Sequence, residues 1–236
     1  MPIIATTSGT TGTPKIMEFS DELLKARTEL TALGKGAKIS ECKVVHVAYT
    51  PSSSAFKKFE EWGNLNGKKI IGLIAYDKII ETFEKEGVDA IDGAPGYLVS
   101  IAKLFEAKGK SAGLKQAITA RARLSRADAI FIQKWLSPNL QVCYGTSETS
   151  QVSSGTAEEI ADIDGCVGFI LPGVQVEIVD GDEIRIKTPV MITEYVDNPV
   201  ETAKHFKDGW FYPGDKGYIT KDNRRSEEHT SELQSH

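Results

Sequence analysis

The sequence predicts an α/β fold, a layered domain with a mixed sheet followed by a smaller β-rich subdomain. The first observation is that apolar strand-like segments alternate with segments of helical periodicity over residues 1–164. The second is a change beyond residue 165, where short alternating strands are separated by Gly-Asp and Asp-Gly turns. We therefore expect an α/β part over residues 1–164 and a β-rich subdomain over residues 165–223.

The first predicted helix runs from Ser20 to Gly34. Ser20 is a suitable N-cap because its hydroxyl can accept a hydrogen bond from a backbone N–H of the first turn, where Asp21 and Glu22 follow. Its apolar face is predicted to comprise Leu23, Leu24, Leu30 and Leu33. Before the helix, residues 6–13 are so rich in Thr and Gly that we expect a loop.

The remaining elements follow from short apolar runs and helical spacing. Strands are predicted at residues 44–49, 69–74, 117–119 and 141–144, and helices at residues 78–85, 97–107 and 127–135. In the second part, strands are predicted at residues 174–179, 183–187 and 218–220. The last segment, residues 224–236, has one Leu among charged and hydroxyl side chains. Because it lacks a hydrophobic face, we expect it to be disordered and not native to the fold.

Composition limits the classes of partner. The formal net charge is -5 at pH 7 and no basic run is present, which argues against nucleic-acid binding. The three cysteines, Cys42, Cys143 and Cys166, are irregularly spaced without a CxxC pair, so neither a disulfide framework nor a zinc site is indicated. No leader peptide and no membrane-spanning stretch is recognisable. We expect a cytoplasmic protein that acts on small molecules.

A Thr/Gly-rich segment at residues 7–15 has the composition of a phosphate-binding loop. Its residues are Thr7, Ser8, Gly9, Thr10, Thr11, Gly12, Thr13, Pro14 and Lys15. The glycines let backbone N–H groups turn inward, the hydroxyls add donors and Lys15 adds a cation. It is not a Walker A loop, because Thr13 and Pro14 separate Gly12 from the lysine. Taken alone, the segment is also compatible with a flexible linker.

Three segments together resemble the signature motifs of the adenylate-forming superfamily, which includes acyl-CoA synthetases and the adenylation domains of peptide synthetases. Residues 8–15 resemble S-G-T-T-G-x-P-K, residues 144–148 resemble Y-G-x-T-E, and residues 209–217 resemble G-W-F-x-T-G-D-x-G. Residues 180–195 resemble the G-E-L-x-I-x-G segment. The likeness covers about residues 3–223, with departures at Ile16 for Gly, Ser147 for Thr and Pro213 for Thr.

The resemblance implies roles for individual residues. The loop residues Thr7, Ser8, Gly9, Thr10, Thr11, Gly12 and Lys15 would hold the β- and γ-phosphates of ATP. In the second motif, Tyr144 would stack on adenine, Gly145 and Thr146 would line the nucleotide, Ser147 would meet the α-phosphate and Glu148 would hold Mg²⁺. In the third, Asp215 would accept hydrogen bonds from the ribose hydroxyls. Lys15, Ser147 and Glu148 are the candidate catalytic residues. Without the likeness, the second motif is equally a capped turn and the third a hairpin turn.

Three further residues are ambiguous. Arg121 and Arg123 stand where the superfamily has a stretch rich in Gly and Ala; they either contact a carboxylate or phosphate of an unusual substrate or lie on the surface, and we favour the surface. His46 either lines the acid pocket or is structural, and a lone His on an apolar strand favours the structural reading.

The implied function is ATP-dependent activation of a carboxylic acid to an acyl-adenylate, with coenzyme A as a further substrate in the second half-reaction. The resemblance also implies preceding segments and a C-terminal domain bearing a catalytic lysine, so we expect a truncated chain. A nucleotide-binding fragment without turnover and a phosphotransferase remain the alternatives.

Overall fold

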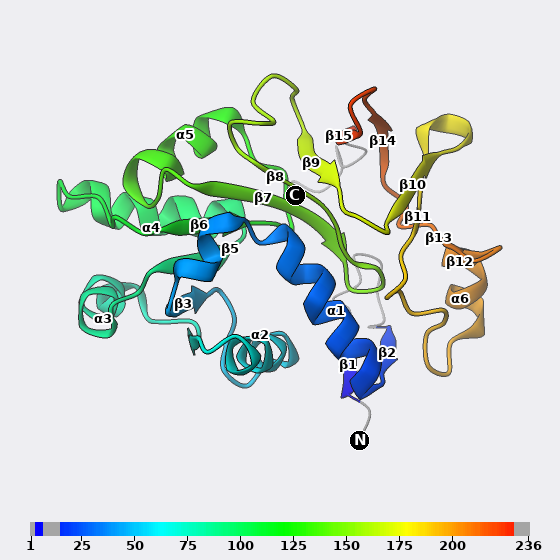
Figure 1. Ribbon diagram of the computed structural model, residues 1–236, viewed down its shortest axis with the longest axis horizontal. Helices are drawn as coiled ribbons and strands as arrows, with labels where there is room; N and C mark the ends of the chain where they lie inside the picture. Colours follow the sequence, from blue (N-terminus) through cyan, green and yellow to red (C-terminus); the bar gives the residue numbers. More distant parts are fainter. Residues whose placement is uncertain (1–2, 7–14, 229–236) are drawn as a thin grey trace, which may run out of the picture. The chain divides into compact units, whose positions relative to one another are not determined.

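A computed structural model of the chain describes residues 3–6 and 15–228 (Figure 1). These residues fall into two compact units. One, here called the β-rich unit, comprises the described parts of 1–34, 144–154 and 165–236; the other, the α/β unit, comprises residues 35–143 and 155–164. This division differs from the predicted one, since residues 1–34 and 144–154 group with the β-rich part. The reason is packing: Leu30 and Val152 share a buried cluster with Val174 and Val176.

The α/β unit contains a parallel sheet with strands in the order β4-β3-β5-β6-β7. The strands are β3 (Val44–Val47), β4 (Lys69–Ile71), β5 (Ala90–Gly93), β6 (Gln116–Thr119) and β7 (Leu140–Thr146), whose last three residues belong to the β-rich unit. The register pairs Val45 with Ala90 and Ile91 with Ala117. Helices α2 (Ser54–Leu65), α3 (Ile79–Glu86), α4 (Pro95–Ala107) and α5 (Arg126–Trp135) accompany the sheet, with short 3-10 turns η1 (Ala37–Glu41) and η2 (Tyr76–Lys78). The predicted α/β class is confirmed.

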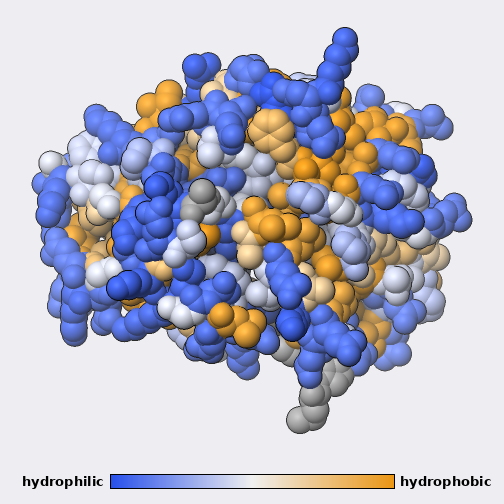
Figure 2. Space-filling model, viewed as in Figure 1, coloured by the Kyte–Doolittle hydropathy of each residue, from blue (hydrophilic) through white to orange (hydrophobic). Residues whose placement is uncertain are grey.

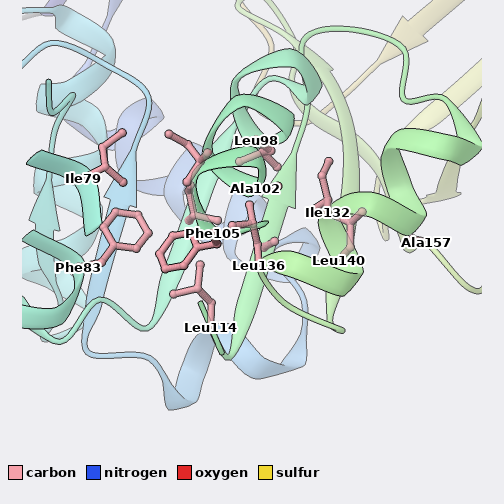
Figure 3. Packing of buried hydrophobic residues seen from close by; sticks show 13 residues of the cluster. Ile79, Phe83, Leu98, Ala102, Phe105, Leu114, Ile132, Leu136, Leu140 and Ala157 are labelled. Atoms are coloured by element: carbon pink, nitrogen blue, oxygen red, sulfur yellow. The ribbon is translucent and has the colours of Figure 1, made fainter. Parts of the chain in front are cut away.

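The main core of the α/β unit is aliphatic and aromatic. Figure 3 shows side chains of α3, α4 and α5 meeting over the sheet, and α4 packs directly on α5. The rings of Phe83 and Phe105 lie 6.0 Å apart between centroids. Fully buried Leu98 and Ile132 each remove a whole aliphatic side chain from water, which stabilises the unit by about 1.5–3 kcal/mol apiece.

The β-rich unit holds antiparallel pairs and a smaller second sheet. Strand β1 (Ile3–Thr6) pairs with β2 (Ile16–Phe19). Strands β8 (Ser150–Thr156), β9 (Cys166–Ile170), β15 (Arg224–Glu228) and β14 (Lys216–Ile219) are hydrogen-bonded in that order, and the last two residues of β8 belong to the α/β unit. The smaller sheet has the order β10 (Gln175–Ile178), β11 (Ile184–Lys187), β13 (Trp210–Phe211) and β12 (Phe206–Lys207). Helices α1 (Asp21–Gly34) and α6 (Pro199–His205) and the 3-10 turn η3 (Asp180–Asp182) complete the unit.

Helix α1 begins where the sequence predicts. The hydroxyl of Ser20 accepts a hydrogen bond from the backbone N–H of Leu23 at 3.1 Å, as expected of an N-cap. Leu24 and Leu30 are buried, but the prediction for Leu33 was wrong: it is 63% exposed. The buried face instead includes Arg27, which is only 8% exposed and becomes important for the candidate site.

Several elements were missed or differ from expectation. Helix α2 was not predicted, although Phe56, Phe59 and Trp62 recur at helical spacing. Strand β8 was missed because its hydroxyl-rich sequence lacks alternation; its buried Ser153 donates to the carbonyl of Val167 at 2.9 Å. The expectation of disorder from residue 224 was wrong for Arg224–Glu228, which form β15 between β14 and β9. Backbone hydrogen bonds to two neighbours order this segment despite its polar composition.

Hydrophilic residues cover most of the face shown in Figure 2, with smaller hydrophobic areas between them. Among the residues that the structure describes, no helix is long and apolar enough to cross a membrane.

Candidate active site

The turn between β7 and β8 organises the candidate site. Thr146 ends β7, and its Oγ1 accepts hydrogen bonds from the backbone N–H groups of Glu148 and Thr149, both at 3.2 Å. This is the local side-chain capping that Thr readily provides. The turn leaves Ser147 exposed and Glu148 buried. Thus the two predicted catalytic residues of this motif point to different environments although they are adjacent in sequence.

Glycine is needed at position 145 for a structural reason that the sequence did not reveal. A Cβ at this position would lie 2.3 Å from the carbonyl oxygen of Ser150 and 2.8 Å from Cα of Gln151 in the neighbouring strand. Both contacts are with backbone, so a side chain here would push β7 and β8 apart. Close packing of the two strands therefore requires glycine, whether or not a ligand approaches.

Arg27 was missed by sequence reasoning and holds the turn in place. Its Nη2 donates to the carbonyl of Ser147 at 2.6 Å, and its Nη1 donates to the carbonyls of Glu148 at 3.1 Å and Val190 at 3.0 Å. The guanidinium also lies over the ring of Phe19, 4.7 Å from its centroid. Burial lowers the pKa of Arg27 to about 10, while the Glu148 carboxylate opposes that shift. The sequence feature that could have revealed this role is that Arg27 lies on the apolar face of the first predicted helix.

Glu148 is the candidate magnesium ligand. It is 8% exposed, and its Oε1 accepts a hydrogen bond from the Tyr195 hydroxyl at 2.8 Å. Burial and the neighbouring carboxylate raise the pKa of Tyr195, so the phenol stays protonated and donates. No cluster of three or more His, Cys, Asp or Glu side chains suited to a metal occurs among the described residues. A single carboxylate fits Mg²⁺ that is bound together with substrate phosphates, because that ion keeps few protein ligands.

Tyr144 and Asp215, from the second and third motifs, lie side by side. The Tyr144 hydroxyl donates to Oδ2 of Asp215 at 2.5 Å, joining residues 71 positions apart. Gly214 precedes Asp215 with φ of 85°, a left-handed conformation that favours glycine. The backbone carbonyl of Asp215 accepts from the N–H of Ile184 at 3.0 Å, which anchors it to β11. The Asp215 carboxylate is therefore oriented while remaining 43% exposed.

One face of the Tyr144 ring is covered. The guanidinium carbon of Arg225 lies 3.3 Å from the ring centroid, and its Nη2 lies 3.8 Å from Oδ2 of Asp215. A planar base stacking on this same face would take the place that the guanidinium occupies.

Lys15 lies in a second group of polar side chains. Its Nζ is 2.9 Å from Oε2 of Glu201 and 2.9 Å from Nε2 of His205, and 4.9 Å from the centroid of the Tyr195 ring. The other ring nitrogen of His205, Nδ1, is 2.8 Å from the carbonyl oxygen of Tyr212. A carbonyl only accepts, so Nδ1 carries the proton and Nε2 of the neutral ring accepts from the lysine. The rest of the predicted phosphate loop, Thr7, Ser8, Gly9, Thr10, Thr11 and Gly12, lies outside the described residues.

The structure thus brings predicted site residues together in one unit: Lys15, Tyr144, Gly145, Thr146, Ser147, Glu148 and Asp215 all belong to the β-rich unit. Tyr195 links two of these groups, since its hydroxyl binds Glu148 and its ring lies beneath Lys15. Arg121 and His46 belong to the other unit, the α/β unit.

Three residues left open by the sequence can be placed. Arg121 is exposed, as we favoured, and its Nη2 also lies 2.5 Å from the buried carboxylate of Asp92. Arg123 is paired with exposed Asp164. His46 is fully buried, with Nε2 2.6 Å from the Tyr97 hydroxyl, and burial lowers its pKa to about 4. This position agrees with the structural reading of His46.

Comparison with known proteins gives the class. A family model described as AMP-binding enzyme matches residues 3–195. Acyl-CoA ligase M9 of a Phoma species is 29% identical over 233 residues, which cover 90% of this chain and 42% of the relative.

Solved structures agree on the fold. The amide bond synthetase McbA of Marinactinospora thermotolerans superposes with a TM-score of 0.81 at 23% identity, covering 96% of this chain and 48% of that protein. The O-succinylbenzoate coenzyme A synthetase MenE of Bacillus subtilis, in complex with ATP and magnesium ion, superposes with a TM-score of 0.79 at 18% identity. The superposition covers 95% of this chain and 49% of that protein. The chain spans less than half the length of each of these three proteins.

The α/β fold with a second, smaller sheet and the match to the family model agree on the class of protein. The chain belongs to the AMP-binding enzyme family, and its curated relatives are acyl-CoA ligases.

Proposed function

We propose that this chain binds Mg·ATP in its β-rich unit and activates a carboxylic acid as an acyl-adenylate, with release of pyrophosphate. The observation that carries the proposal is the 2.5 Å hydrogen bond from Tyr144 to Asp215, which joins two separate family motifs. One carboxylate oxygen of Asp215 is engaged by the phenol. The other is then available to accept hydrogen bonds from the two ribose hydroxyls.

The turn at residues 147–149 supplies the next contacts. Ser147 is exposed, so its hydroxyl is free to reach the α-phosphate, while its carbonyl is held by Arg27. The Thr146 hydroxyl already accepts from two backbone N–H groups, so we assign Thr146 a positioning role rather than a nucleotide contact. Gly145 likewise positions the turn through the close approach of Ser150.

Glu148 and Lys15 would act on the phosphates. The carboxylate of Glu148 would hold Mg²⁺ through the oxygen that Tyr195 does not engage. When bound, Mg²⁺ neutralises negative charge on the phosphate oxygens. Lys15, with the proposed donors at Thr7, Ser8, Gly9, Thr10, Thr11 and Gly12, would hold the β- and γ-phosphates. To do so, Lys15 must exchange its contacts with Glu201 and His205 for the phosphates.

The reaction then needs positioning more than covalent chemistry. An oxygen of the substrate carboxylate attacks the α-phosphorus, a new C–O–P linkage forms, and the bond from the α-phosphorus to the bridging oxygen breaks. The bridging oxygen leaves with pyrophosphate. Oriented donors that meet the developing charge lower the barrier, because they need not reorganise during the step. The names of the curated relatives support transfer of the acyl group to coenzyme A as the following step.

The test is to incubate the chain with Mg·ATP and a panel of fatty, aryl and amino acids and to identify the nucleotide product. AMP and pyrophosphate that form only when both ATP and one class of acid are present support the proposal. ADP and phosphate transferred to an acceptor would instead show a phosphotransferase. Mg·ATP binding without turnover on any acid would mean that the chain is a nucleotide-binding fragment.

A further inference from the structure

The group of polar side chains around Lys15 is built from two segments that are far apart in the chain. The backbone N–H of Val196 donates to the carbonyl of Ile16 at 2.9 Å, which holds the segment before helix α6 against the start of β2. Within α6, Glu201 and His205 are four residues apart, so they share one side of the helix. Nζ of Lys15 lies 2.9 Å from Oε2 of Glu201 and 2.9 Å from Nε2 of His205. The helix thus presents a carboxylate and an imidazole to the same ammonium.

The imidazole of His205 is held in one orientation. Its Nδ1 donates to the carbonyl of Tyr212 at 2.8 Å, and the backbone N–H of Tyr212 donates to the carbonyl of His205 at 2.8 Å. The ring stacks on that of Phe211, with 6.0 Å between centroids and 26° between planes. The side chain is only 15% exposed, and its Nε2 faces Lys15 and lies 3.4 Å from Oε2 of Glu201. In this arrangement the neutral ring accepts from the lysine.

Charged and titratable side chains approach His205 from several segments. They are Lys15 before β2, Tyr195 before α6, Glu201 and Lys204 on α6, and Lys207 on β12. The hydrogen bond and charge of Lys15 lower the pKa of Glu201, so this acid is a carboxylate at neutral pH. Burial raises the pKa of Tyr195, so its hydroxyl is neutral. Lys204 and Lys207 are exposed, and water and salt screen their charges. Lys15 is therefore the cation that most strongly opposes a second proton on His205.

Lys15 and a protonated His205 exclude each other. Two cations 2.9 Å apart repel, whereas a neutral Nε2 accepts a hydrogen bond from the ammonium. If Lys15 leaves, the repulsion disappears while the carboxylate of Glu201 stays close to Nε2. A nearby carboxylate favours the protonated ring. Because imidazole is the side chain that titrates close to neutral pH, a proton can replace the lysine under ordinary conditions.

We propose that His205 is a positioning residue for Lys15, and that binding of the ATP phosphates is coupled to the uptake of a proton by His205. The inference rests on the proposed function, because it takes those phosphates as the group that draws Lys15 away. When Lys15 turns to the phosphates, Nε2 loses its donor and binds a proton from the solvent. The N–H so formed donates to Oε2 of Glu201, so the carboxylate keeps a cationic partner. Because the two events are linked, Mg·ATP binds more tightly as the pH falls.

The experiment is calorimetric titration of the full chain with Mg·ATP at pH 7 in MOPS and in Tris, two buffers of different ionisation enthalpy. The dependence of the measured enthalpy on the buffer gives the number of protons taken up. His205→Gln keeps an oxygen acceptor for Lys15 but cannot titrate, so its proton uptake should be smaller than that of the wild type. His46→Gln, which removes a buried imidazole from the α/β unit, should keep the wild-type value. Protons exchanged by Mg·ATP itself are common to all three proteins.

The pH profile separates this role from a merely structural one. We expect the wild-type chain and His205→Gln to bind Mg·ATP alike at pH 8, and the wild type to bind about three- to tenfold more tightly than the variant at pH 6. A variant that only disturbed the structure would bind more weakly by the same factor at both pH values.

A measurement on the wild-type chain alone covers the case in which His205→Gln does not fold. The ¹⁵N signals of the His205 ring are recorded at pH 7 with and without saturating Mg·ATP. We expect the Nε2 signal to move towards that of an imidazolium, and an unchanged ring overturns the inference. Equal proton uptake by the wild type and a folded His205→Gln overturns it as well.

Inorganic tripolyphosphate with Mg²⁺ separates the inference from the proposed function, because it offers phosphates without a nucleoside. If tripolyphosphate binds with proton uptake at His205 but Mg·ATP does not bind, the inference stands and the proposed function fails. If Mg·ATP binds and reacts without proton uptake at His205, the proposed function stands and the inference fails. If neither binds to a folded chain, both are overturned.

Discussion

Nζ of Lys15 lies 2.9 Å from Oε2 of Glu201, so the lysine at the end of the predicted phosphate loop is held by helix α6. If Lys15 binds the phosphates of ATP, this contact competes with the nucleotide. Glu201→Gln should therefore tighten Mg·ATP binding by about two- to fivefold, the modest effect expected of a partly exposed ion pair.

The control for this prediction is Glu29→Gln, which removes an exposed carboxylate from helix α1 of the same unit. Titration calorimetry measures all three proteins. Weaker binding by Glu201→Gln would show that the pair orients Lys15 for the nucleotide rather than restraining it.

Arg27 should be essential for the turn that carries Ser147 and Glu148. Arg27→Met keeps much of the apolar stem but removes the guanidinium donors to the carbonyl oxygens of Ser147, Glu148 and Val190. We expect the free energy of unfolding to fall by about 2–4 kcal/mol. Lys25→Met, at an exposed position of the same helix, should change it by no more than about 0.5 kcal/mol. Urea denaturation measures both, and equal effects of the two variants would contradict the role assigned to Arg27.

Much of the fold could be predicted because its signals are local. Alternating strands and helices, the N-cap at Ser20 and the Gly-Asp turns all depend on residues close together in sequence. Helix α2 could also have been predicted, because Phe56, Phe59 and Trp62 recur at helical spacing. Strand β15 was not, because it is ordered by hydrogen bonds to strands far away in the sequence rather than by its own composition.

For the candidate site, the sequence likewise located individual residues but not the contacts between them. The motifs located Tyr144, Glu148 and Asp215, but no pattern in the sequence showed that Tyr144 would donate to Asp215. Arg121 was assigned to the surface and is exposed, but no pattern in the sequence showed that its guanidinium would pair with the buried carboxylate of Asp92. Pairings of this kind depend on the tertiary fold, which single-sequence patterns do not encode.

Glu148 should account for the magnesium dependence of nucleotide binding. Glu148→Gln keeps the size of the side chain and removes the charge that Mg²⁺ requires. We expect the gain in ATP affinity on adding Mg²⁺ to fall about tenfold, with magnesium-free ATP binding unchanged. Tyr195→Phe, which keeps the carboxylate and removes only its 2.8 Å donor, should retain most of the gain. A Glu148→Gln protein that responds to Mg²⁺ like wild type would place the ion elsewhere.

His46 should make the stability of the chain depend on pH. Burial lowers its pKa from 6.5 to about 4, so between these values the unfolded chain binds a proton that the folded chain excludes. Stability contributed by the neutral ring is present above pH 6.5 and is lost as the pH falls towards 4, by up to about 3 kcal/mol. His46→Gln does not titrate, and its urea unfolding should lack this component. A variant with the same pH profile as wild type would assign the loss to other groups.

The central claim is that Asp215, oriented by Tyr144, binds the ribose of ATP. The most direct measurement is calorimetric titration with Mg·ATP of the wild-type chain, of Asp215→Ala and of Asp180→Ala, which removes an exposed carboxylate from the same unit. The account predicts saturable binding by the wild type and by Asp180→Ala, and a loss of about 2–5 kcal/mol of binding free energy in Asp215→Ala. Unchanged binding by Asp215→Ala, or no binding by a folded wild-type chain, would contradict it.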